Sequence, residues 1–65
     1  MFSKGDKVVF VSANQQAYRA VVVQEYVAED GTIRVELDYQ LPPSQGGGVV
    51  RAAPPYTRVG KPMFD

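Results

Sequence analysis

The stretch AYRAVVVQEYVAEDGTIRVELDY, residues 17–39, decides the fold. Its second half alternates between apolar and polar residues from Ile33 to Tyr39. A period of two is typical of a strand with one buried and one solvent-facing side. Its first half, Ala17 to Val27, is the longest apolar run of the chain. Ala, Gln and Glu favour a helix there, but three consecutive valines flanked by tyrosines favour a strand.

The turn between these two runs is signalled by Asp30-Gly31. Asp-Gly between two β runs predicts a type I′ hairpin turn, in which both central residues have positive φ. We therefore expect residues 21–27 to pair with residues 33–39. A run of about 11 residues is long for one strand, and small barrels bend such a strand with a bulge so that it serves two sheets.

The flanking segments predict shorter strands. Residues 7–12 (KVVFVS) and 49–53 (VVRAA) are rich in valine, and Pro-Pro pairs at 42–43 and 54–55 interrupt the chain because proline cannot donate to a strand ladder. Residues 56–59 (YTRV) predict a 3-10 turn followed by a brief last strand. Together these segments predict an all-β, five-stranded small barrel over residues 1–60. A barrel is expected rather than an open sheet because closure removes exposed sheet edges. Residues 61–65 form a C-terminal tail.

Composition limits the possible functions. The 65 residues contain no Cys and no His, and seven basic residues balance seven acidic ones. Without Cys or His a disulfide is impossible and a structural zinc site has no ordinary ligands. Zero net charge disfavours nucleic-acid binding, because such binding depends on an excess of basic residues that neutralise phosphates. No apolar run approaches the length of a membrane span. We expect a soluble cytoplasmic protein without metal or cofactor. Short chains are commonly stabilised by disulfides, a metal or a partner subunit, and of these only self-association is left open here.

Taken together, these features resemble the SH3-like small barrels, particularly those of the Tudor and KOW type. The resemblance covers roughly residues 4–60. It rests on Gly5-Asp6 before the first strand, a long bent strand, a tight turn, and a strand, proline and YTRV run at the end. It implies a one-turn 3-10 segment before the last strand. Fold-level likeness does not by itself give function.

The architecture is also similar to that of the type II plasmid-encoded dihydrofolate reductases, tiny barrels that form tetramers around a pore. Three segments follow in the same order as in that family: Gly5-Asp6-Lys7-Val8, the bent strand Ala17–Tyr26, and the run Val49–Val59. The family's pore motif is Val-Gln-Ile-Tyr, whereas residues 49–52 here are Val-Val-Arg-Ala. The resemblance therefore implies the architecture and not the activity.

Reactive side chains are scarce. Nucleophilic catalysis needs a base beside the nucleophile, and the chain has no His for that role. Glu36 and Asp38 share the polar face of their strand, where alternating charge is typical of an exposed surface. The glycine run 46–48 opens no helix and has no adjacent lysine, so it predicts a flexible connection rather than a phosphate loop. We expect no catalytic residue.

The aromatic and basic residues are the candidate contact residues. Four tyrosines, whose rings end in a hydroxyl, together with Phe10 are many aromatic rings for so small a core. Tudor-type barrels use clustered rings to hold methylated cations, so the resemblance implies an aromatic patch, with ordinary core packing as the alternative. The proposed partner contacts are Tyr18, Tyr39, Tyr56 and Arg51. KOW-type barrels carry basic stripes for RNA, and the corresponding residues here would be Arg19, Arg51 and Arg58, if the second and late strands adjoin.

The sequence thus favours a small, non-catalytic binding module that holds a protein or peptide partner and forms a homo-oligomer. Its size suggests an accessory factor of a phage, plasmid or gene cassette. Two alternatives stay open: an oligomeric enzyme with a pore site, and a nucleic-acid binder. Met63-Phe64 in the tail would either fold back to plug the barrel or dock on another subunit.

Overall fold

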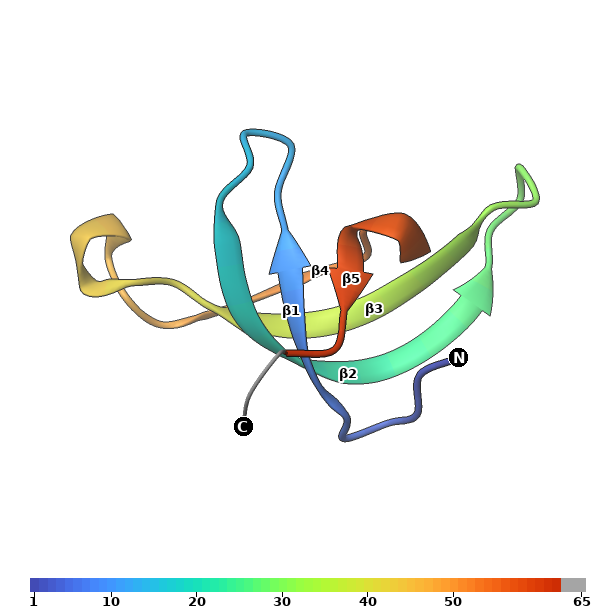
Figure 1. Ribbon diagram of the computed structural model, residues 1–65, viewed down its shortest axis with the longest axis horizontal. Coiled ribbons are helices and arrows are strands. Elements are labelled where there is room, and N and C mark those ends of the chain that lie inside the picture. Colours follow the sequence, from blue (N-terminus) through green and yellow to red (C-terminus); the bar gives the residue numbers. More distant parts are fainter. Residues whose placement is uncertain (63–65) are drawn as a thin grey trace.

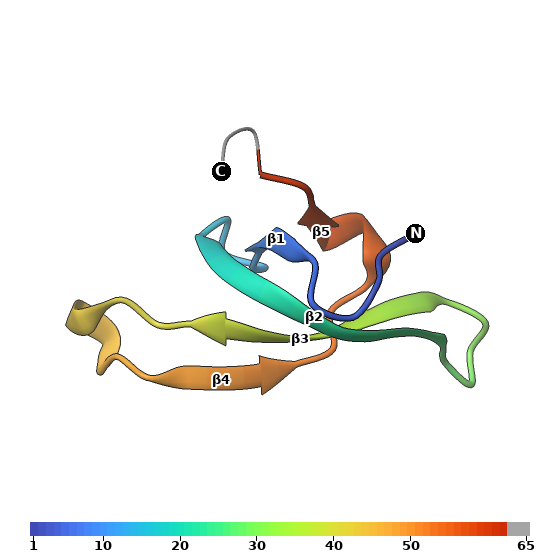
Figure 2. The same cartoon turned by 90° about the horizontal axis from the view of Figure 1, so that it is seen from below.

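The computed structural model describes residues 1–62 as five antiparallel strands in one sheet, with the order β4-β3-β2-β1-β5 (Figure 1). The strands are β1 (Lys7–Val11), β2 (Ala17–Val27), β3 (Ile33–Gln40), β4 (Val49–Ala52) and β5 (Val59–Gly60). The prediction of an all-β, five-stranded protein is confirmed. The sheet curls so that β3 and β4 lie in one layer, β1 and β5 lie in another, and β2 runs between them (Figure 2).

The bend of β2 comes from a bulge, as expected. Residues 17–21 of β2 pair with β1, and the strand pairs with β3 from Ala20, opposite Tyr39, to Val27, opposite Ile33. The register shifts between Val22 and Gln24, which leaves Val23 as the extra residue. An extra residue increases the local twist and bends the strand. The predicted pairing of 21–27 with 33–39 is confirmed.

The turn at Asp30-Gly31 is not the predicted type I′ turn. Only Gly31, at φ 85°, has positive φ in this turn. The Gly31 N–H donates to the Ala28 carbonyl at 2.9 Å, and the Ala28 N–H donates to the Thr32 carbonyl at 2.8 Å. The loop is therefore residues 29–31, a β-turn closed by a left-handed glycine, which is the usual form of a hairpin loop of this length. Sequence reasoning placed the glycine in the right conformation but made the loop one residue too short.

The core lies between the two layers of the curled sheet. Its buried apolar residues come from β1, β2, β3 and β5: Val8, Phe10, Ala20, Val22, Val35, Leu37 and Val59. Val35 and Leu37 are completely buried. Both belong to the alternating stretch from which the fold was predicted, and their polar neighbours Glu36 and Asp38 lie on the other face, half-buried. Burial of alternate residues confirms the predicted orientation of β3.

Two short 3-10 helices occupy the connections that prolines mark. The helix η1 (Pro43–Gln45) precedes the glycine run, and η2 (Tyr56–Arg58) immediately precedes β5. The predicted 3-10 turn before the last strand is confirmed. Among residues 1–62 no helix is long and apolar enough to cross a membrane. The expectation for Met63 and Phe64 lies outside the described residues.

Candidate binding groove

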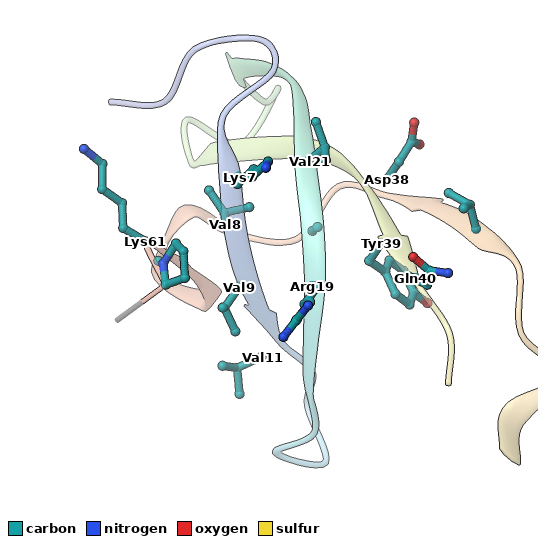
Figure 3. A pocket seen from close by; sticks show the side chains of 14 residues that line it. Lys7, Val8, Val9, Val11, Arg19, Val21, Asp38, Tyr39, Gln40 and Lys61 are labelled. Carbon is teal, nitrogen blue, oxygen red and sulfur yellow. The ribbon is translucent and has the colours of Figure 1, made fainter. Parts of the chain in front are cut away.

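A groove of about 830 Å³ lies on the outer face of the sheet, opposite the core (Figure 3). Strands β1, β2 and β3 form its floor, Val49 of β4 lies at one side, and Lys61 and Pro62 close the other. The strand alternation determines its lining: while Val8 and Phe10 point into the core, the residues between and beside them face the groove. Protein pockets that hold ligands have volumes of about 300–1,000 Å³.

The floor of the groove is apolar. Val11, Val21 and Val49 are 40%, 45% and 66% exposed, and Val9 is half-buried beside them. Cross-strand partners lie on the same face of an antiparallel pair, so Val9 is next to Arg19 and Val21 lies between Lys7 and Asp38. These valines lie on β1, β2 and β4 and line the same side of the sheet, with β3 between Val21 and Val49. Exposed apolar side chains that gather on one side of a small protein are a candidate contact surface.

Basic side chains surround this apolar floor. Lys7, Arg19 and Lys61 line the groove, and among residues 1–62 Asp38 is its one lining carboxylate. Arg51 binds Asp38 through two hydrogen bonds, Nε to Oδ1 at 2.8 Å and a terminal nitrogen to Oδ2 at 3.1 Å. The hydrogen bond from Arg51, more than its charge, holds the pKa of Asp38 below its ordinary value. Because Arg51 neutralises Asp38, the groove carries a positive excess.

The three tyrosines proposed as contact residues do not form one patch. The Tyr18 and Tyr39 ring centroids are 5.0 Å apart, and both rings pack on Phe10. Tyr56 instead packs on Phe2, with centroids 5.3 Å apart. All three tyrosines are half-buried against the core. Tyr18 and Tyr39 contact each other directly, so they are not opposite walls of a cage. Tyr39 also lines the groove.

The three arginines considered for nucleic-acid contact lie apart. Arg19 is on β2 and Arg51 is on β4, and β3 lies between these strands. The condition for a continuous stripe, that the second and late strands adjoin, is therefore not met. Arg58 lies in η2. Of the three, Arg19 lines the groove and Arg51 lies beside it through Asp38.

A smaller hollow of about 370 Å³ lies at the start of β2, lined among others by Tyr18, Arg19 and Pro42. The Tyr18 hydroxyl donates to Gln45 Oε1 at 3.1 Å, and Gln45 Nε2 donates to Gln16 Oε1 at 3.1 Å. These contacts attach η1 to the β1–β2 turn. Because these polar groups bind one another, the Tyr18 hydroxyl has a structural role in this hollow.

The contact residues proposed from the sequence did not include the valine floor or the two lysines of the groove. The signal for the floor was present, because KVVFV has apolar residues on both faces of β1 and only one of those faces reaches the core. Lys7 and Lys61 had no such signal. They are 54 positions apart in sequence, and only the pairing of β5 with β1 brings their segments together.

Comparison of the chain with known protein families, with curated proteins and with solved structures finds no match. Within residues 1–62 no group of acidic side chains is arranged to hold a metal ion.

Proposed function

We propose that this protein is a non-catalytic binding module that holds an acidic, partly apolar protein segment in the groove. The observation that carries the proposal is the combination of exposed valines with Lys7, Arg19 and Lys61 around them. An apolar floor provides contact area, and basic side chains at its margin select a partner of opposite charge. Tyr39 contributes from the groove lining, and Arg51 keeps Asp38 neutralised.

The scaffold that supports this role is, in our proposal, an SH3-like barrel. The strand order, the bulge in β2 and η2 directly before β5 are the features that favour it. We further propose that the module works in the cytoplasm as an accessory protein. The pairing of β1, β2 and β3 fixes the backbone of most groove residues without a ligand, so binding requires little backbone ordering there.

Binding of short labelled peptides with blocked ends tests the proposal. One peptide alternates Glu and Val, a second alternates Lys and Val, and a third alternates Glu and Ser. We expect only the first to bind, and we expect the Arg19→Gln/Lys61→Gln variant to bind it about tenfold more weakly, the loss of roughly 1.4 kcal/mol. Arg58→Gln is the matched control, because Arg58 is an exposed arginine outside the groove lining.

Two results would contradict the proposal. One is equal binding of the Glu/Val peptide to the wild type and to the groove variant. The other is preferential binding of a single-stranded oligothymidylate probe, with a steep dependence on salt, because phosphate contacts release counterions. That second result would favour the nucleic-acid alternative, with Lys7, Arg19 and Lys61 as the phosphate contacts.

A further inference from the structure

The end of the β2–β3 hairpin is a second exposed apolar surface. Val27 and Ile33 are 68% and 47% exposed, and they are directly paired across the two strands. Tyr26, next to Val27, is also exposed. The hairpin extends beyond the rest of the sheet (Figures 1 and 2), and within residues 1–62 the side chains of Val27 and Ile33 stay largely uncovered. We call residues 26–33 the hairpin end.

The hairpin end is acidic where the groove is basic. Glu29 and Asp30 are at its loop, and Glu25 and Glu36 flank it on the two strands. Arg34 is the one basic residue between positions 24 and 36, and its guanidinium donates to the Ala53 carbonyl at 2.7 Å. The zero net charge of the chain therefore hides two oppositely charged regions. Each of them combines its charge with exposed β-branched residues.

The hairpin end cannot reach the groove of its own chain. Val21 in the groove and Val27 at the hairpin end are six residues apart on the same strand, which is about 20 Å of extended backbone. Both strands of this hairpin are paired from Ala20, opposite Tyr39, to Val27, opposite Ile33. A paired strand does not fold back on itself, so a hairpin end that fills a groove must belong to another molecule.

From this complementarity we infer that the groove holds the hairpin end of a second copy of this chain, in a head-to-tail contact. The inference rests on the proposed function, because it uses the groove as the binding site and names the partner. Glu29 and Asp30 of one copy meet Lys7, Arg19 and Lys61 of the next, and Val27 and Ile33 cover the valine floor. A head-to-tail contact leaves a free groove and a free hairpin end in every dimer, so it produces closed rings or open chains.

Two variants separate this contact from any other. The hairpin variant, Val27→Thr/Glu29→Gln, keeps the groove intact; it spares Asp30, which accepts hydrogen bonds from Thr32 N and Oγ1 at 3.0 and 2.6 Å. The groove variant, Arg19→Gln/Lys61→Gln, keeps the hairpin end intact. All four changed residues are exposed, so both variants should fold, and circular dichroism verifies this.

Analytical ultracentrifugation of the full chain provides the test. We expect the wild type to form assemblies that grow with concentration, and we expect each variant alone to be monomeric. An equimolar mixture of the two variants should form a dimer and nothing larger, because one intact hairpin end meets one intact groove. A wild type that stays monomeric would overturn the inference. So would a mixture that stays monomeric while the wild type assembles, because an intact hairpin end and an intact groove would then not bind each other.

A peptide of residues 24–36, closed into a ring at its ends to keep the hairpin, distinguishes this inference from the proposed function. We expect it to bind the hairpin variant, whose groove is free, and to dissociate wild-type assemblies. Binding of the Glu/Val peptide without binding of the cyclic hairpin would overturn the head-to-tail contact and leave the groove as a site for another partner. If neither peptide bound, the groove would not be a binding site, and the proposed function would be wrong as well.

Discussion

Asp38 on β3 and Arg51 on β4 are direct cross-strand partners, and two hydrogen bonds join their side chains. The pair is exposed, so it contributes little to stability at neutral pH. The pair acts through its charge: Arg51 neutralises Asp38, the carboxylate that would repel the acidic partner that we propose for the groove. The pair also attaches edge strand β4, which has no second neighbour in the sheet.

The Asp38–Arg51 pair gives a defined pH dependence. The pKa of Asp38 is lowered from 3.8 in the folded chain, chiefly by the hydrogen bond from Arg51. A depressed folded pKa contributes stability above the unfolded value, and this contribution disappears as the pH falls through the folded pKa. We expect Asp38→Asn to be slightly less stable than the wild type near neutral pH and equally stable in strong acid. Thermal melts across this range measure the difference; a constant difference would contradict it.

A glycine at position 15, in the loop 13–15, should raise the stability of the fold. It has the same hydrogen bonds as the loop 29–31, with Ser12 N–H donating to Gln16 and Gln15 N–H donating to Ser12, but its left-handed position is Gln15 at φ 67°. A left-handed non-glycine residue costs about 1–2 kcal/mol, and glycine adds about 0.4–1 kcal/mol of unfolded-state entropy. We expect Gln15→Gly to stabilise the fold by roughly 0.5 kcal/mol.

Two controls accompany this change. Gly31→Gln should destabilise the protein by a similar amount, because it introduces the strain that Gln15→Gly removes. Ala13→Gly, in the same loop but without positive φ, should destabilise it slightly. Urea denaturation measures all three. A loss of stability in Gln15→Gly equal to that in Ala13→Gly would show that the left-handed position carries no strain.

Leu37 is the largest fully buried side chain among residues 1–62. It is completely buried, and truncation of a buried leucine costs about 2–5 kcal/mol. A chain of this length rarely has more than about 3–5 kcal/mol of stability from its core. We expect Leu37→Ala to be largely unfolded at room temperature, whereas Val49→Ala, at a 66% exposed position, should retain the fold. Circular dichroism and urea denaturation distinguish these outcomes; a folded Leu37→Ala variant would contradict the assignment of the core.

Substitutions of Tyr18 test whether its ring stabilises the fold or belongs to a binding site. Its hydroxyl binds Gln45 at an exposed position, so Tyr18→Phe should change stability by less than about 0.5 kcal/mol. Tyr18→Ala removes the ring that contacts Phe10 and Tyr39 and should cost about 2 kcal/mol. If Tyr18→Ala left the stability unchanged and abolished peptide binding, the ring would belong to a binding site instead.

The predictable part of the fold was the part with local signals. Alternation around Val35 and Leu37, the valine run of β2 and the prolines beside β4 each depend on a few neighbouring residues. The position of the bulge at Val23 left no such signal, because Val21, Val22 and Val23 are identical side chains and any of them suits either face.

The candidate site was predictable to a smaller degree. The three tyrosines were singled out as rings in excess of what the core needs, yet Tyr18, Tyr39 and Tyr56 all pack against it, because a curled sheet with few leucines uses ring bodies to complete its core. Arg51 was placed among the contacts without its partner, since the register that sets Asp38 opposite it is a property of the sheet and not of either segment. The groove joins the two ends of the chain, which no local pattern can indicate.

The return of β5 to β1 has a consequence for the order in which the protein unfolds. All other strand pairs join neighbours along the chain, and local pairs form early and at small entropic cost. The β1–β5 pair comprises only Val9 opposite Gly60 and Phe10 opposite Val59. We therefore expect the β5 amides to exchange with deuterium sooner than those of β2 and β3, in an opening that uncovers Val8 and Phe10 while the β1–β2, β2–β3 and β3–β4 pairs persist.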